Sequence, residues 1–290
     1  MILQHGSDSM LVNFLLFLLM KITTSFSKST SISRLYMRKY FFMFLLFFSS
    51  LHLNALVLRD GGELEAKRNV VADSYNFWVY TPENYSNEGT PMPLIIFLHG
   101  ASLCGNKMNR VRRYGVLDAI QRGTSVPAMV VAPQNSGGAW NPKKLNKLLE
   151  WMIENYPVDS NRVYVLGMSL GGYGTMDFVG TYPNKIAAAL AICGGTTLAD
   201  LSGLGELPLW IVHGTADRDV RLSESKRVVD YLQKLGKDKL LSFDWVKGWN
   251  HGRPVRLFYK QQTYDWLLSH SLDDQPRRLN KTFPITRNTR

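Results

Sequence analysis

Short apolar runs alternate along the chain with longer stretches whose apolar positions recur every three or four residues. The short runs are rich in Val, Ile and Leu, which is typical of strands buried on both faces of a sheet. They predict strands over residues 69–72, 77–80, 94–98, 126–133, 163–166, 186–193, 209–212 and 240–246. The longer stretches predict helices over residues 109–122, 142–156, 170–182, 223–235 and 254–269. Strands that alternate with helices indicate an α/β fold with a mostly parallel sheet and helices on both faces.

One strand–turn–helix segment carries a pattern with chemical meaning. The apolar run 163–166 leads into Gly167-Met-Ser-Leu-Gly171, which fits the nucleophile-elbow pattern G-x-S-x-G. In such a turn Ser169 takes a strained backbone conformation, and only glycines let the neighbouring backbone approach closely. The turn predicts that the Ser169 hydroxyl stands above the sheet edge, beside the backbone N–H groups of a helix N-terminus.

A serine nucleophile needs a general base, and that base needs a carboxylate to orient it. Asp217 and Asp219 follow the predicted strand 209–212, and His251 lies in a loop after the last predicted strand. Serine, acid and histidine thus come in the chain order of α/β-hydrolases, and all lie after carboxyl ends of strands, where open sheets bind ligands. We therefore expect these residues to meet in one site.

At this point the chain resembles the α/β-hydrolase esterases, nearest to the secreted feruloyl and acetylxylan esterase, polyhydroxyalkanoate depolymerase and dienelactone-hydrolase-like group. The resemblance extends over about residues 65–268 and rests on the segments Leu98-His-Gly100, 155–169, His213-Gly-Thr-Ala-Asp217 and Asn250-His-Gly252. It implies a triad of Ser169, Asp217 and His251. Asp217 is preferred over Asp219 because it fits the family pattern H-G-x-x-D-x-x-V. The resemblance also implies that the N–H groups of Leu170 and Ala101 form the oxyanion hole, and that no cofactor takes part.

The function expected from this set is serine ester hydrolysis through an acyl-enzyme, on feruloyl or acetyl esters of plant polysaccharides. Trp140 and Trp249 lie in loops after predicted strands, where they could stack on a sugar or phenolic ring or simply pack the loops. Two alternatives stay open. One is a serine peptidase of the prolyl-oligopeptidase-like type, although residues 1–55 are too few for the propeller domain of those enzymes. The other is a non-catalytic binding protein on the same fold.

Charge and cysteine content narrow the choice of partners. The net charge is +11, but residues 1–55 and 271–290 hold ten of the 34 Lys and Arg and three of the 23 Asp and Glu, which leaves +4 for residues 56–270. A nucleic-acid partner is not expected without a basic surface on the folded part. No His/Cys cluster has metal-ligand spacing, so no metal is expected either. Cys104 and Cys193 are interpreted as free thiols.

The two ends of the chain differ from its middle in their pattern of apolar, polar and basic residues. Arg38-Lys39, the apolar run 40–48 and the more polar run 49–55 form the three regions of a secretory signal peptide, predicted over 37–55 with cleavage after Ala55. Met37 stands directly before the basic pair, so residues 1–36 are interpreted as a misassigned upstream extension. We expect secretion or export to a periplasm, with no stable membrane association after cleavage, and the alternative is an uncleaved anchor. Residues 271–290 are predicted to be a polar, basic tail.

Overall fold

The structure is a computed structural model, and it describes residues 55–58, 60–86 and 89–285. The predicted upstream extension and all of the predicted signal peptide except Ala55 lie outside these residues. Among the described residues, no helix combines the length and the apolar character needed to cross a membrane.

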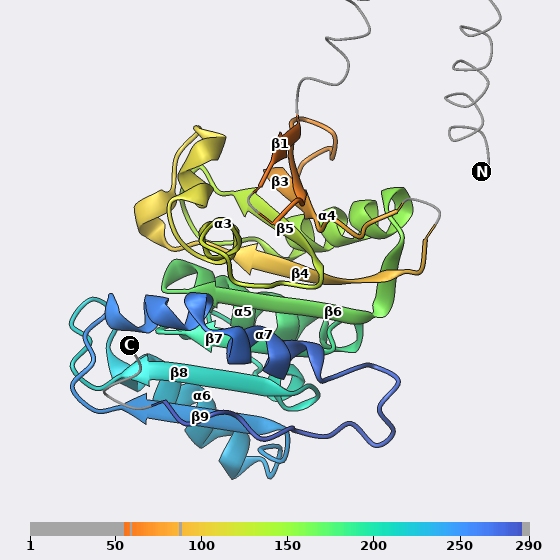
Figure 1. Cartoon of the computed structure of the whole chain (residues 1–290). Coiled ribbons are helices and arrows are strands. Elements are labelled where there is room, and N and C mark those ends of the chain that lie inside the picture. Colours follow the sequence, from red (N-terminus) through yellow and green to blue (C-terminus); the bar gives the residue numbers. More distant parts are fainter. Residues whose placement is uncertain (1–54, 59, 87–88, 286–290) are drawn as a thin grey trace, which may run out of the picture. The chain divides into compact units, whose positions relative to one another are not determined.

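A single nine-stranded sheet forms the centre of the fold, in the order β1-β2-β3-β5-β4-β6-β7-β8-β9 (Figure 1). The strands are β1 (Ala55–Val57), β2 (Glu63–Lys67), β3 (Asn76–Thr81), β4 (Met92–Leu98), β5 (Met129–Gln134), β6 (Val158–Met168), β7 (Ala188–Ile192), β8 (Leu209–Gly214) and β9 (Leu241–Val246). The first three strands are antiparallel to their neighbours, and β5, β4, β6, β7, β8 and β9 run parallel. The mostly parallel sheet predicted from the apolar runs is therefore present.

Helices cover both faces of this sheet (Figure 1). The α-helices are α3 (Val116–Gln121), α4 (Pro142–Asn155), α5 (Leu170–Thr181), α6 (Leu222–Lys234) and α7 (Gln261–Leu268). Side chains of α3 and α7 pack with one set of strand residues, and those of α4, α5 and α6 pack with the other set. Strand residues alternate between these two cores, so the central strands are buried on both faces, as their continuous apolar runs predict.

The order of the strands determines where a site can form. The chain runs from β4 outward to β5, then returns past β4 to β6, so the direction of winding reverses beside β4. In open α/β sheets, ligands bind outside the carboxyl ends of the strands at such a reversal. The carboxyl ends of β4 and β6 are followed directly by His99 and Ser169.

The predicted helix 109–122 is divided in the structure. A 3-10 segment, η2 (Met108–Arg112), precedes α3, and Gly115 between them has a φ of 94°. A Cβ on Gly115 would lie 2.0 Å from the Phe97 ring, so this position has no space for a side chain. The predicted helix 254–269 is divided in the same way into η5 (Arg253–Tyr259) and α7.

Two further predictions differ from the structure. Residues 69–72 form a turn in which Asn69 has a φ of 53°, and the strand lies earlier, at the more polar β2. The predicted tail packs onto the domain over residues 271–285. There the Phe283 ring meets Trp210 at a centroid distance of 5.1 Å, and the Arg277 guanidinium donates to the carbonyl oxygens of Ile186 and Ala187 at 2.6 and 2.7 Å.

Candidate active site

Ser169 stands at a strained turn between β6 and α5, with φ 59° and ψ −121°. Two glycines make this turn possible. A Cβ on Gly171 would lie 1.8 Å from the carbonyl oxygen of Leu98, and one on Gly167 would lie 2.3 Å from the carbonyl oxygen of Gly171. A non-glycine residue with positive φ is uncommon and is held by its surroundings. Here the backbone N–H of Ser169 donates to Ile192 at 2.8 Å, which ties the turn to the neighbouring strand.

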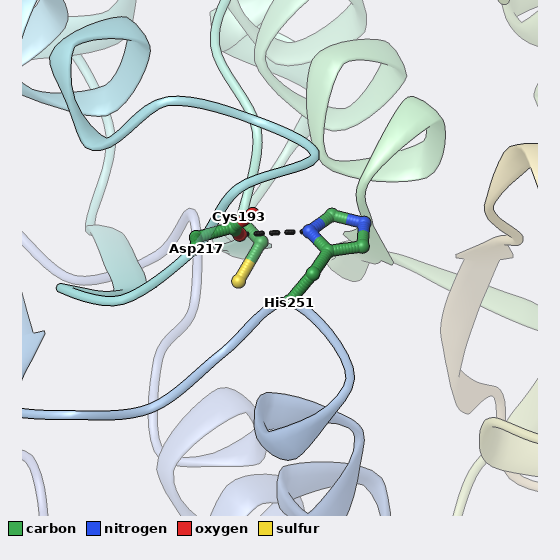
Figure 2. Close-up of side chains that lie close together, drawn as sticks. All are labelled: Cys193, Asp217 and His251. Carbon is green, nitrogen blue, oxygen red and sulfur yellow. Dashed lines mark hydrogen bonds and ion pairs between the residues drawn. The ribbon is translucent and has the colours of Figure 1, made fainter.

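Asp217 and His251 form a hydrogen-bonded pair across two loops, one after β8 and one after β9 (Figure 2). His251 Nδ1 donates to Asp217 Oδ2 at 2.7 Å. The other carboxylate oxygen accepts the backbone N–H groups of Asp219 and Val220 at 3.0 and 2.9 Å. Of the two candidate acids, it is Asp217 that contacts His251, while Asp219 contributes its backbone.

The Asp217 side chain is fully buried, and its charge is stabilised by this set of donors. Burial raises the pKa of the carboxyl, but the hydrogen bonds from His251, Val220 and Asp219 outweigh burial and hold the pKa below its ordinary value. Asp217 is therefore a carboxylate at neutral pH. A charged acceptor fixes the orientation of the His251 ring and leaves Nε2 as the basic nitrogen.

A second histidine supports Asp217 from the protein interior. His213 Nε2 lies 3.2 Å from Asp217 Oδ2 and 3.0 Å from the carbonyl oxygen of Val220, while Nδ1 lies 2.8 Å from Ser225 Oγ. Burial lowers the pKa of His213, so the ring is neutral at pH 7. Because Nε2 faces two acceptors, it carries the ring proton. His213 thus helps to hold the Asp217 carboxylate in place.

Ser169 and His251 line one pocket of about 600 Å³. Apolar groups contribute most of its wall, which is formed by Gly100, Ala101, Ser102, Tyr114, Met168, Ser169, Asp219, His251, Gly252, Val255 and Tyr259. Among the described residues no hydrogen bond joins Ser169 Oγ to His251, and such bonds are commonly long before substrate binds. The pocket is therefore bordered by the nucleophile turn, by His251 and by the loop after β4.

That loop brings Ala101 to the same pocket, where Leu170 begins α5. Within the described part of the chain, neither the Ala101 nor the Leu170 N–H donates to a protein acceptor, so both are free to bind an anion. His99 holds the loop from below. Its Nδ1 contacts the carbonyl oxygen of Gly100 at 2.8 Å, and its Nε2 accepts the N–H of Asn135 at 3.0 Å.

Trp140 and Trp249 do not line the pocket, which differs from the expectation that they contact substrate. Their exposed fractions are 3% and 1%. Trp140 packs over Gly174 of α5 and donates from Nε1 to the carbonyl oxygen of His99 at 3.2 Å. A buried ring has no free face for a ligand, so the packing alternative describes both residues. The pocket instead contains Tyr114 and Tyr259, which carry no motif or spacing that the sequence could reveal.

Cys193 approaches the Asp217–His251 pair, and the three residues offer ligand atoms that all lie within 4.8 Å of one another (Figure 2). This grouping arises in space, so sequence spacing does not reveal it. Burial, followed by the nearby Asp217 charge, raises the pKa of the Cys193 thiol. A metal requires a thiolate, and His251 Nδ1 is already committed to Asp217. The chemistry of the cluster therefore favours the hydrogen-bonded pair over a metal site. Cys104 and Cys193 are both free thiols, as interpreted.

The strand order, the elbow and the strand-end loops define the α/β-hydrolase fold, and solved structures agree. A feruloyl esterase module from Clostridium thermocellum complexed with sinapinate matches with a TM-score of 0.57 and 14% identity, over 72% of this chain and 89% of that one. A thermostable esterase matches with a TM-score of 0.56 and 22% identity, over 75% and 62%. At such identities the likeness establishes the fold, and the predicted fold class is confirmed.

Curated relatives are acetylxylan and feruloyl esterases, which confirms the resemblance inferred from the motifs. Acetylxylan esterase A of Emericella nidulans is 29% identical over 128 residues, 41% of either chain. Feruloyl esterase D of Neurospora crassa is 24% identical over 188 residues, 60% of this chain and 63% of the relative. A bifunctional acetylxylan esterase/xylanase of Neocallimastix patriciarum is 27% identical over 147 residues, 48% of this chain and 21% of the relative. The chain thus spans less than two thirds of these relatives, and no protein-family model matches it.

Proposed function

We propose that this chain is a serine carboxylic-ester hydrolase that cleaves acetyl or feruloyl esters of plant polysaccharides. One observation carries the proposal: His251, which Asp217 orients through a 2.7 Å hydrogen bond, lines the same pocket as Ser169 at its strained turn. A binding protein has no need of a buried carboxylate that orients a histidine at the same pocket as a half-buried serine. The likeness to acetylxylan and feruloyl esterases supports the same substrate class.

In the first half of the reaction, His251 Nε2 takes the hydroxyl proton of Ser169 while Oγ attacks the ester carbonyl carbon. The negative charge that forms on the carbonyl oxygen is bound by the N–H groups of Leu170 and Ala101. Asp217 stabilises the imidazolium that forms and keeps its orientation. The tetrahedral intermediate then collapses, His251 gives its proton to the leaving alcohol, and the acyl group stays on Ser169.

In the second half, water takes the place of the alcohol. His251 removes one proton from the water, the resulting hydroxide adds to the acyl carbon, and the ester bond to Ser169 breaks. His251 returns the proton to Ser169 Oγ, and the free acid leaves. The apolar wall formed by Met168, Val255 and Tyr259 suits the acyl group, and a pocket of about 600 Å³ is within the range that holds a small organic ligand.

The location of the reaction belongs to the same proposal. Polysaccharide esters lie outside the cell, and residues 37–55 carry the signal-peptide pattern described above. We therefore propose that the protein is exported and acts on extracellular polymer. N-terminal sequencing of material from the medium would test this directly, with a mature chain that begins after Ala55 as the expected result.

The test of the function is hydrolysis of p-nitrophenyl acetate, methyl ferulate and acetylated xylan by the wild type and by Ser169→Ala. The variant keeps the fold because Ala is smaller than Ser, and we expect it to lose at least about 1,000-fold in kcat. Equal rates for the two proteins would refute the role of Ser169. Cleavage of a peptide p-nitroanilide without cleavage of any of the esters would favour the peptidase alternative.

A further inference from the structure

Tyr114 reaches the loop after β4 from the segment between η2 and α3. Its Oη accepts the backbone N–H of Gly100 at 3.0 Å. An N–H group can only donate, so this bond uses a lone pair of Oη and leaves the phenolic proton available. Ser102 Oγ, at 3.5 Å, is too distant for a strong bond to that proton. With respect to the described residues, the Tyr114 hydroxyl therefore presents an uncommitted donor at the wall of the pocket.

Gly100 shows where this donor lies relative to the nucleophile. Its φ of −79° and ψ of 172° suit any residue, so its backbone does not require glycine. A Cβ there, however, would lie 2.8 Å from Tyr114 Oη and 3.4 Å from Ser169 Cβ. Tyr114 Oη and Ser169 Cβ therefore lie next to the same backbone position, where Gly100 has no room for a side chain. An ester carbonyl that Ser169 attacks has to lie beside this position, next to the N–H of Ala101.

We infer that the Tyr114 hydroxyl is a third donor to the substrate carbonyl oxygen, alongside the N–H groups of Leu170 and Ala101. The inference rests on the proposed ester hydrolysis and adds a catalytic residue to it. As the oxygen becomes negative, a phenolic donor held at a fixed place stabilises it without reorganisation. The bond from Gly100 holds the hydroxyl in place, so the same contact positions both the loop and the donor.

Tyr259 lines the same pocket and provides a matched control. Its hydroxyl donates to Asp118 Oδ2 at 2.7 Å, which commits the proton away from Ser169. Replacing either tyrosine by Phe keeps the ring and removes one hydroxyl from the pocket wall. Only the Tyr114→Phe replacement removes a donor that faces the reacting carbonyl.

The experiment compares p-nitrophenyl acetate with its thiono analogue, in which sulfur replaces the carbonyl oxygen and accepts hydrogen bonds poorly. We expect Tyr114→Phe to lower kcat on the oxygen ester by about 10- to 100-fold with little change in KM, and to reduce the preference for oxygen over sulfur by a similar factor. Tyr259→Phe should leave that preference unchanged. The preference for the oxygen ester over the thiono ester reports specifically on the hydrogen bond from Tyr114, because a general loosening of the site would slow the hydrolysis of both esters by the same factor.

Three results would overturn the inference. They are an unchanged kcat in Tyr114→Phe, an unchanged preference despite a lower kcat, or an equal loss of preference in Tyr259→Phe. Failure of the proposed function looks different, because the wild type would then hydrolyse neither ester. Circular dichroism and the melting temperature of each variant confirm that folded proteins are being compared.

Discussion

Gly171→Ala tests how the nucleophile turn and the loop after β4 depend on each other. The new Cβ would meet the carbonyl oxygen of Leu98 at 1.8 Å, its carbonyl carbon at 2.5 Å and the carbonyl oxygen of His99 at 2.9 Å. All three are backbone atoms, so no side-chain rotation relieves the contact. Leu98 and His99 lead directly into Gly100 and Ala101, so a shift of this backbone moves the proposed oxyanion donor away from Ser169.

The size of the effect follows from these distances. Real Cβ contacts stay above 3.0 Å, so the Leu98 carbonyl has to retreat by at least 1.2 Å from its 1.8 Å position. A misplacement of about 1 Å costs about 100-fold in rate, and the loss of one oxyanion donor costs about 100- to 1,000-fold in kcat. Overpacking of this kind also lowers the free energy of unfolding by about 1–3 kcal/mol.

The assay measures kcat on p-nitrophenyl acetate and the free energy of unfolding in urea for the same preparations. Gly236→Ala is the control, because Gly236 has a φ of 66° after the end of α6, and apart from its chain neighbours no described residue has an atom within 4 Å of its Cβ position. It should lose about 1 kcal/mol of stability with unchanged kcat. If Gly171→Ala keeps its kcat within threefold of the wild type, the rate of hydrolysis does not depend on the close packing of the Ser169 turn against the loop after β4.

Three further predictions concern the packing around the site and the chain's end. Burial lowers the pKa of His99 to about 4, so between pH 6.5 and 4 the unfolded chain binds a proton that the folded protein does not. The free energy of unfolding should therefore fall by up to about 3 kcal/mol as the pH drops through this window. Urea titrations should show a smaller fall for His99→Gln. An equal fall in the variant would mean that His99 is not the group responsible. Trp140→Phe should lower the free energy of unfolding in urea by about 1 kcal/mol more than Trp249→Phe does. The reason is that Trp140 Nε1 donates to the carbonyl oxygen of His99, whereas Trp249 Nε1 has no hydrogen-bond partner among the residues that the structure describes. Equal costs would mean that this hydrogen bond adds nothing. Arg277→Met should lower the melting temperature, because it removes the donor to the carbonyl oxygens of Ile186 and Ala187. Arg278→Met is the control, because the Arg278 side chain is exposed, and its melting temperature should stay close to that of the wild type. Equal melting temperatures for the two variants would show that the Arg277 contacts do not stabilise the fold.

The sequence predicts the parts of this protein that follow from local pattern. Continuous apolar runs identify the parallel strands because both faces of those strands are buried, and the glycines around Ser169 predict a turn that few residues tolerate. The chain order of Ser169, Asp217 and His251 predicts that they share a sheet edge, since each follows a strand. Asp217 and His251 do lie in contact, although 34 positions separate them.

Features that depend on contacts between residues far apart in the chain could not be predicted from the sequence. Trp140 lies in a loop by pattern, yet a glycine of α5 makes room for its ring in the interior. Residues 271–285 look polar, but a few anchors such as Phe283 and Arg277 attach them to the domain. Tyr114 falls within a predicted helix, and only the interruption at Gly115 brings its hydroxyl to the loop after β4.

Covalent labelling with a fluorophosphonate, followed by mass spectrometry of the digested protein, shows directly whether Ser169 is an activated nucleophile. Only a serine activated by a neighbouring base reacts quickly with such a probe. We expect one adduct, on the peptide that contains Ser169, with no adduct in Ser169→Ala and labelling slowed by at least about 100-fold in His251→Ala. A folded wild-type protein that takes no label, or takes it on another serine, would contradict the role of Ser169 as the nucleophile.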